Sequence, residues 1–137
     1  MDAPDRPTPA DYQNAAQLRA AVRAFLHRGE QAARHAGLTP QRQLLLLMIK
    51  GAPDGRERAT VTELAERMQL AQNSVTELVA RAEAIGLIER EGSATDGRVV
   101  HLRLTAEGER RLAATVRELR ADRDHLVAVV SALHAAP

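Results

Sequence analysis

The pattern of apolar residues predicts a helix over residues 10–36, near the start of the chain. Its apolar positions recur at i, i+4, i+7 and i+8, which is the spacing of one helix face: Leu18, Val22, Phe25 and Leu26. Gly37 is placed to end this helix, because glycine readily takes the left-handed conformation found just past a helix C-terminus. Residues 1–12, rich in proline and aspartate, are predicted to form a flexible arm.

A second helix is predicted to follow Thr39, which is placed as its N-cap with Pro40 in the first turn. The run from Leu44 to Ile49 is apolar on all sides. We therefore expect this helix to be buried over most of its surface.

Two further helices lie close together in the middle of the chain. Thr60 and Glu63 match a capping box, which predicts a short helix ending at about Met68. After a tight turn, a longer helix is predicted from about Gln72 to Ile85. At about 100° per residue, one face of the longer helix is apolar and consists of Val75, Leu78, Val79, Ala82 and Ile85.

The residues after Gly86 predict a β-hairpin and then more helix. Strands are expected at residues 87–91 and 99–104, where Val100, Leu102 and Leu104 alternate with polar positions. The loop between the strands has the composition of a turn, and residues 105–137 have helical spacing. This order of elements predicts a mostly α protein, a winged helix-turn-helix with N- and C-terminal helices and a small β-hairpin wing.

The outward face of the longer central helix is small and polar. It carries Asn73 and Glu77, with Ser74, Thr76 and Arg81 on its flanks. Small polar side chains suit a helix that enters a DNA major groove about 12 Å wide, where amides, hydroxyls and guanidinium groups bond bases or phosphates. Glu77 repels phosphate unless it accepts from a cytosine amine or pairs with Arg81 four residues on. The same pattern is also typical of an amphipathic surface helix.

The predicted hairpin loop carries an arginine, Arg98, beside Asp96 and Gly97. An arginine at this position reaches a narrow minor groove, where the potential is most negative, and Asp96 is placed to orient it. Asp-Gly-Arg is also an ordinary polar turn. Its weight as a DNA contact comes from its place after the helix pair.

Composition excludes several classes of protein. The chain has 137 residues, 45% of them hydrophobic, but one Phe, one Tyr and no Trp, so the core is expected to be aliphatic. The absence of cysteine excludes disulfides, thiolate zinc sites and thiol nucleophiles, and fits a cytoplasmic location. No stretch reaches the ~18 apolar residues of a membrane span, and the N-terminus has no apolar signal-peptide core.

The remaining polar residues do not indicate an enzyme. The five histidines show no metal-ligand spacing, and no phosphate-binding glycine loop or nucleophile elbow is present. We therefore expect no catalytic residues, no metal and no cofactor. Position alone makes Arg23 and His27, with Arg28, weak candidates to line a ligand cavity on the first helix.

Charge argues mildly against nucleic-acid binding. The formal net charge is +1, and residues 51–111 hold nine arginines and eleven acidic residues, a difference of −2. Binding to DNA therefore depends on where the charges lie rather than on their sum. A winged helix that has lost DNA binding and serves as a protein-interaction module is the alternative.

Five segments together resemble the MarR family of bacterial transcriptional regulators. They are residues 38–47 (LTPQRQLLLL), 60–68 (TVTELAERM), 73–90 (NSVTELVARAEAIGLIER), 96–98 (DGR) and 104–108 (LTAEG), and they occur in the family's order over roughly residues 15 to 135. The resemblance implies a homodimer with intertwined terminal helices, a palindromic double-stranded operator, and repression relieved by a small molecule bound between the dimer and DNA-binding lobes.

The resemblance also implies positions and boundaries in this chain. DNA contacts would fall on Gln72, Asn73, Ser74, Thr76, Glu77 and Arg81 of the recognition helix, and on Asp96 and Arg98 of the wing. The DNA-binding domain would span 38–104, and residues 13–37 and 105–137 would form the dimerisation region. Ala71 departs from the family's pattern, since a capping serine is usual there.

Overall fold

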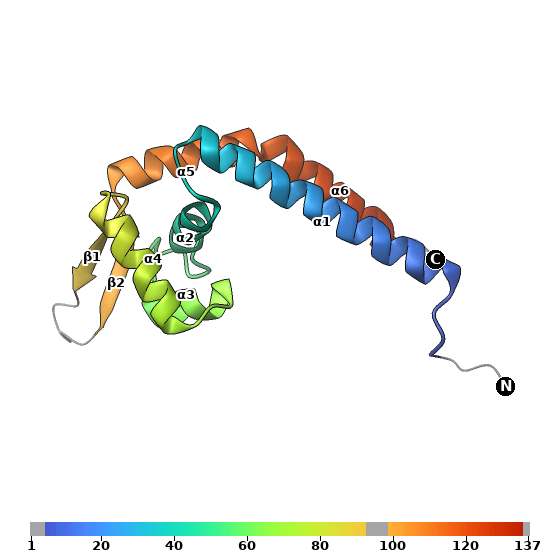
Figure 1. Cartoon of the computed structure of the whole chain (residues 1–137), viewed down its shortest axis with the longest axis horizontal. Coiled ribbons are helices and arrows are strands. Elements are labelled where there is room, and N and C mark those ends of the chain that lie inside the picture. The colour runs from blue at the N-terminus through green and yellow to red at the C-terminus, as the bar shows by residue number, and fades with distance from the viewer. Residues whose placement is uncertain (1–4, 93–98, 136–137) are drawn as a thin grey trace.

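The fold was taken from a computed structural model, which describes residues 5–92 and 99–135. The elements in chain order are α1 (Pro9–His35), α2 (Pro40–Lys50), α3 (Val61–Met68), α4 (Gln72–Ala84), β1 (Ile88–Gly92), β2 (Val100–Leu104), α5 (Ala106–Glu118) and α6 (Arg120–Ala135). Helices α2 to α4, the two strands and α5 form a body, and α1 and α6 run side by side as an arm that extends from it (Figure 1). This is the predicted winged helix-turn-helix with terminal helices.

Helix α1 begins at Pro9, inside the segment that was predicted to be a flexible arm. Thr8 and Asp11 form a capping box, in which the Asp11 amide donates to Thr8 Oγ1 over 3.2 Å and the Thr8 amide donates to Asp11 Oδ2 over 2.7 Å. Pro9 occupies the first helical turn, where its missing N–H costs nothing. The prediction that residues 1–12 form a flexible segment was therefore wrong for residues 9–12.

Helix α2 starts as predicted, with Thr39 Oγ1 accepting from the Arg42 amide over 3.1 Å. Leu45, Leu46 and Ile49 are fully buried, but Leu44 and Leu47 are 40% and 38% exposed. The expectation of a helix buried on most sides was wrong for that face, because the body covers only one side of α2 within a single chain.

The helix-turn-helix is formed by α3 and α4. Thr60 and Glu63 make the predicted capping box, and the hydrogen bond from the Thr60 backbone lowers the pKa of the Glu63 carboxyl. Gln69 ends α3 in the left-handed conformation, with φ at 54°. In α4 the predicted inward residues Val75, Val79 and Ala82 are fully buried and Leu78 is half-buried.

The prediction that Ile85 faces inward was wrong, since its side chain is 50% exposed. Helix α4 ends one residue earlier, at Ala84, and Ile85 is its C-cap with φ −97° and ψ 11°. The residue has left the helical spiral, so the 100° step no longer places it on the apolar face.

The two strands pair antiparallel, with Ile88 opposite Leu104 and Gly92 opposite Val100. Leu102 and Leu104 are buried, while Val100 lies farther out on the hairpin and is 36% exposed. Ala59, just before α3, exchanges two backbone hydrogen bonds with Leu102 (2.8 and 3.0 Å), a contact that the sequence did not predict. This bridge attaches the hairpin to the start of the helix-turn-helix.

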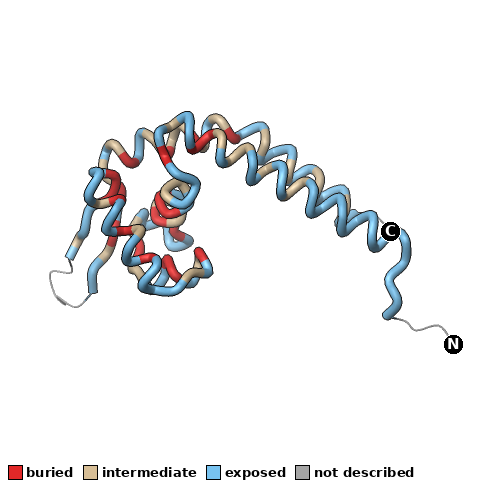
Figure 2. Tube along the Cα trace, viewed as in Figure 1, coloured by how far each residue is buried: buried red, intermediate tan, exposed pale blue. Residues whose placement is uncertain are grey.

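The core lies in the body, and the arm has almost none (Figure 2). Ala32 and Ala33 are the buried residues of α1, both near its body end, and α6 has none among the residues described. Across residues 5–92 and 99–135, no helix has the length and apolar character needed to cross a membrane.

Helix α5 packs closely against the hairpin at Gly108. A Cβ atom at this position would overlap the carbonyl oxygen of Leu87 and crowd the Leu104 side chain. Gly108→Ala is therefore expected to destabilise the protein by about 1–3 kcal/mol despite alanine's higher helix propensity. The free energy of unfolding, measured by denaturant titration, checks this.

Gly29→Ala is the matched control, because no described atom outside the local helix lies within 4 Å of a Cβ there. This change is expected to stabilise the mid-helix position in α1 by roughly 0.5–1 kcal/mol. Equal effects of the two substitutions would show that the contact between Gly108 and Leu87 does not constrain the fold.

Candidate nucleic-acid interface

Helix α4 presents its predicted polar residues to solvent. Its buried residues Val75, Val79 and Ala82 pack on the body, which fixes the rotation of the helix. All six predicted contact residues of this helix are exposed: Gln72, Asn73, Ser74, Thr76, Glu77 and Arg81. The helix therefore has the geometry of an exposed reading element on a rigid support.

Three of these side chains already make local hydrogen bonds. Gln72 Nε2 donates to Thr62 Oγ1 over 3.4 Å, and the Thr76 hydroxyl donates to the Gln72 carbonyl over 2.9 Å. Asn73 Oδ1 accepts from the Ser74 amide over 3.0 Å. Thr76 has thus used its one donor, and it offers a methyl group and oxygen lone pairs to a ligand.

Ser74, Glu77 and Arg81 line one cleft of about 230 Å³ between α4 and the start of α2. Gln41, in the first turn of α2, lies in the same cleft. Sequence reasoning missed Gln41, since the spacing within α2 does not reveal which helix lies opposite it. The cleft joins an amide, a hydroxyl, a carboxylate and a guanidinium at one edge of the recognition helix.

The structure does not pair Glu77 with Arg81. Among the described residues, neither side chain has an ion-pair partner within 4.0 Å, although they are four residues apart on one helix. Most other arginines of the body are engaged, for example Arg90 with Glu83 over 3.1 Å and Arg67 with the Met48 carbonyl over 2.8 Å. Arg81 therefore offers its full charge to a ligand, and Glu77 stays unneutralised beside it.

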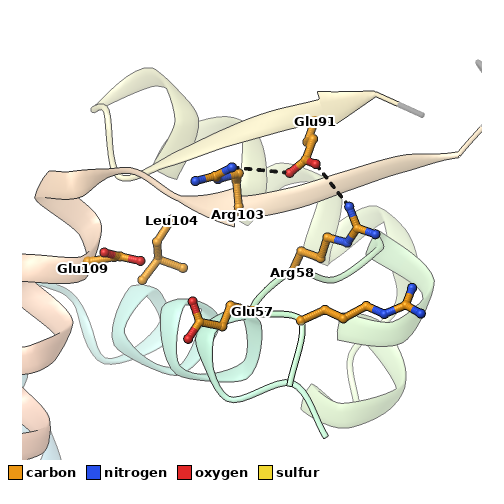
Figure 3. Close-up of a pocket in the computed structure, with 7 residues that line it drawn as sticks. Glu57, Arg58, Glu91, Arg103, Leu104 and Glu109 are labelled. Atoms are coloured by element: carbon orange, nitrogen blue, oxygen red, sulfur yellow. Dashed lines mark hydrogen bonds and ion pairs between the residues drawn. The ribbon is translucent and has the colours of Figure 1, made fainter. Parts of the chain in front are cut away.

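Both strands of the hairpin take part in an ion-pair chain that sequence reasoning also missed (Figure 3). Glu91 on β1 accepts from Arg58 over 3.1 Å and lies 3.7 Å from Arg103 on β2. Arg103 also lies 3.4 Å from Glu89. This chain links both strands to the segment before α3, so it fixes the direction in which the hairpin leaves the body.

The loop between the strands carries the predicted wing contacts, Asp96 and Arg98. Both residues lie outside the described residues. Their role in DNA binding stays a prediction from the sequence.

Two hollows lie along α1, and one of them lies between α1 and the body. Arg23 and His27, the weak ligand candidates, line an open hollow of about 560 Å³ on α1 together with Leu26 and Glu30. An adjoining apolar pocket of about 340 Å³ shares Leu26 and Glu30 and lies between α1, α2 and Leu119; its other lining residues are Phe25, Gly29, Pro40, Gln41, Gln43, Leu44 and Leu47. Arg28 lines neither hollow. No group of three metal-ligating side chains was found within the described ranges.

The fold, with α4 exposed as the second helix of the helix-turn-helix, defines a winged helix-turn-helix protein. The family model of the MarR family matches residues 36–99. The HTH-type transcriptional repressor MdtR of Bacillus subtilis is 36% identical over 73 residues, which cover 53% of this chain and 44% of that relative, less than half of its length.

Solved structures agree over most of the chain. A MarR family protein from Bacillus stearothermophilus superimposes with a TM-score of 0.71 at 27% identity, covering 85% of this chain and 78% of that one. A MarR mutant from E. coli complexed with operator DNA gives a TM-score of 0.65 at 17% identity, over 82% of this chain and 78% of that one. Residues 36–99 thus match the MarR family model, and the fold of the chain is that of a MarR family structure.

The N-terminus of α4 has no side-chain cap. Ala71 is the N-cap and makes no side-chain hydrogen bond, so the first amides of α4 lack a side-chain acceptor from this residue. Ala71→Ser should supply one and stabilise the protein by about 1 kcal/mol in denaturant unfolding.

The control is Ala80→Ser on the exposed side of the same helix, where serine caps nothing and lowers helix propensity. This control should be slightly destabilising. A loss of stability from Ala71→Ser as well would contradict the assignment of Ala71 as the N-cap.

Proposed function

We propose that the chain is a sequence-specific DNA-binding transcriptional regulator, a repressor, that acts as a homodimer on a palindromic operator and responds to a small-molecule effector. The observation that carries the proposal is the exposed small-polar face of α4, held on a buried apolar face and bordered by the cleft with Arg81 and Gln41. DNA recognition needs such a rigid, unobstructed helix to enter the major groove.

The chemistry of the α4 face divides the contacts into two kinds. Asn73 has an amide suited to a bidentate bond with adenine, and Glu77 has a carboxylate suited to a cytosine amine. Arg81, at the edge of the cleft and without an ion-pair partner among the described residues, suits a phosphate. The MarR structure solved with operator DNA shares this fold, which supports placing α4 in a groove.

The exposed apolar side chains of the arm support the proposal of a homodimer. Large apolar side chains along α1 and α6 are exposed in the single chain: Tyr12, Leu18, Leu26, Val127 and Val130, at 65%, 40%, 59%, 60% and 43%. Two helices side by side bury too little apolar surface to hold a long arm in water, and a second copy of the arm covers these residues. A two-fold dimer then places two α4 helices on two half-sites.

The apolar pocket between α1, α2 and Leu119 supports the proposal that a small-molecule effector binds. Leucine and phenylalanine side chains form its walls, and Gln41 and Gln43 provide polar groups that can orient a ligand. It lies between the arm and the body, which are the two parts whose relative position sets the spacing of the α4 helices.

Glu77 favours the alternative function, a protein-interaction module. Its carboxylate is unneutralised on the face that would meet DNA, and residues 51–111 carry eleven acidic residues against nine arginines. A protein partner bound by this face would show little dependence on salt, whereas DNA binding weakens steeply with salt.

Selection of the purified protein on a random double-stranded DNA library tests the proposal. An inverted repeat should be enriched, with half-site centres about one helical turn apart (~34–36 Å), and affinity should fall steeply with salt.

Asn73→Ala should reduce the preference for the correct base at one base pair by ~1–3 kcal/mol of binding free energy. Arg81→Gln should weaken binding to all sequences and reduce the salt slope by about one.

Arg34→Gln, an exposed arginine on α1, is the charge-matched control and should leave affinity unchanged. No enrichment by protein shown to be folded and dimeric would reject the DNA-binding proposal and favour the interaction module.

A screen of neutral aromatic fragments by thermal denaturation tests the effector pocket. Fragments that bind there should raise the melting temperature of the natural protein but not of Leu47→Gln, which puts a polar group into the pocket wall. Ile85→Gln, at the C-cap of α4 outside both the pocket and the arm and 50% exposed, is the control and should respond like the natural protein. Equal protection of Leu47→Gln would place the fragments elsewhere.

A further inference from the structure

The arm and the body meet at a joint in the C-terminal helical region. Helix α5 ends at Glu118, α6 begins at Arg120, and Leu119 between them has φ −91° and ψ 3°. The fully buried Thr115 donates its hydroxyl to the Leu112 carbonyl over 2.8 Å. A hydroxyl that competes for a helix carbonyl in this way favours bending of the helix, so the break has a local cause.

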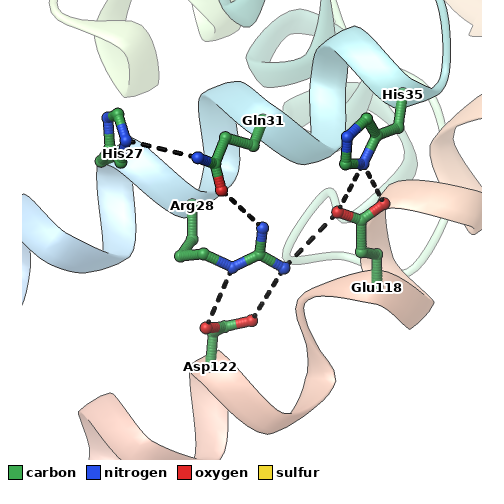
Figure 4. A network of polar contacts seen from close by, with 6 residues as sticks. All are labelled: His27, Arg28, Gln31, His35, Glu118 and Asp122. Carbon is green, nitrogen blue, oxygen red and sulfur yellow. Dashed lines mark hydrogen bonds and ion pairs between the residues drawn. The ribbon is translucent and has the colours of Figure 1, made fainter.

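One arginine spans this joint (Figure 4). Arg28, on α1, lies 3.4 Å from Glu118, the last residue of α5, and 3.4 Å from Asp122, in the first turn of α6. A second nitrogen contact to Asp122 measures 3.5 Å. The guanidinium therefore holds one carboxylate on each side of the break.

Neighbouring side chains fix the position of both ends of this link. Gln31 Oε1 accepts from Arg28 Nη1 over 2.8 Å, which orients the guanidinium. His35 Nδ1 lies 2.9 Å from Glu118 Oε2, which holds that carboxylate from the other side. The side chains of Arg28, Glu118 and Asp122 are 35%, 29% and 30% exposed, so water only partly screens them.

The geometry makes the link sensitive to the angle of the joint. Glu118 moves with α5 and the body, and Asp122 moves with α6 and the arm. The contacts already measure 3.4 to 3.5 Å, close to the upper limit of a hydrogen bond. A change of the joint angle that moves the two carboxylates apart therefore lengthens at least one contact beyond hydrogen-bond range.

We infer that Arg28 is a positioning residue that fixes the angle between arm and body and thereby the separation of the two α4 helices in the dimer. The consequence for DNA rests on the proposed function, but the effect on the angle does not. Arg28 lies on α1 in the arm and outside α4, so it acts without contacting DNA.

The angle can be measured without DNA because the chain contains no cysteine. Glu66→Cys on α3 and Ala132→Cys on α6 are exposed positions for a pair of spin labels, one on the body and one on the arm. Labelled chains are diluted into excess unlabelled protein, so that the distances are measured within one chain. Pulsed electron spin resonance then gives the distance distribution.

A single narrow distribution is expected for the otherwise unchanged protein, and a broadened or shifted one for both Arg28→Gln and Asp122→Asn. Arg34→Gln, which removes a charge from the same helix, should keep the narrow distribution. Circular dichroism of each variant confirms that it is folded. A distribution in folded Arg28→Gln that matches Arg34→Gln overturns the inference.

The selected inverted repeat provides the second readout, with one or two base pairs inserted between its half-sites. The natural protein and Arg34→Gln should bind one spacing best, and Arg28→Gln should lose that preference while binding the other spacings at least as well. An equal loss at every spacing, together with a narrow distance distribution, assigns Arg28 a structural role only. Failure of the natural protein to bind any DNA rejects the proposed function, while the spin-label distances still decide the role of Arg28.

Discussion

The winged helix-turn-helix depends on one point where the end of α4, both strands and the start of α5 meet. Thr105 donates its hydroxyl to the Gly86 carbonyl over 2.6 Å and its amide to the Leu87 carbonyl over 3.0 Å, and it caps α5 through the Gly108 amide. Gly108 lies against the same Leu87 carbonyl, too close for a side chain. Because the Thr105 hydroxyl and backbone atoms of all these elements make the contacts, the hairpin and α5 cannot move separately from α4 without breaking several hydrogen bonds at once.

Through these contacts, the position of the arm determines the position of α4. Helix α5 carries the joint at its far end, and Leu119 at that joint also lines the apolar pocket. Phe25 and Gly29, on the turns of α1 that carry Arg28, line the same pocket. Pocket, ion-pair link and joint are therefore adjacent, and α5 connects them to α4 as a rigid element.

The sequence predicted features that depend on neighbours along the chain. The N-cap at Thr39 and the capping box at Thr60 were predicted correctly, because a cap uses residues three apart. Contacts across the fold were not predicted: Gln41 beside Arg81, Arg58 with Glu91, and Arg28 with Asp122. The periods within each helix contain no information on which other helix lies opposite, and Ile85 shows that the period fails once a helix ends.

Under the proposed function, the weak net charge makes the geometry of the dimer important for selectivity between DNA sequences. Each phosphate contact adds a sequence-independent part of the affinity, and a chain with net charge +1, several of whose arginines pair with carboxylates, has few charges left for it. The nonspecific affinity of such a dimer is low, and tight binding would require both α4 helices to engage their half-sites at once. The second engagement is intramolecular, and its gain depends on how well the spacing fits. Under the proposed function, fixing the arm angle through Arg28 therefore raises selectivity more than an added surface arginine would, since that arginine would strengthen binding to every sequence alike.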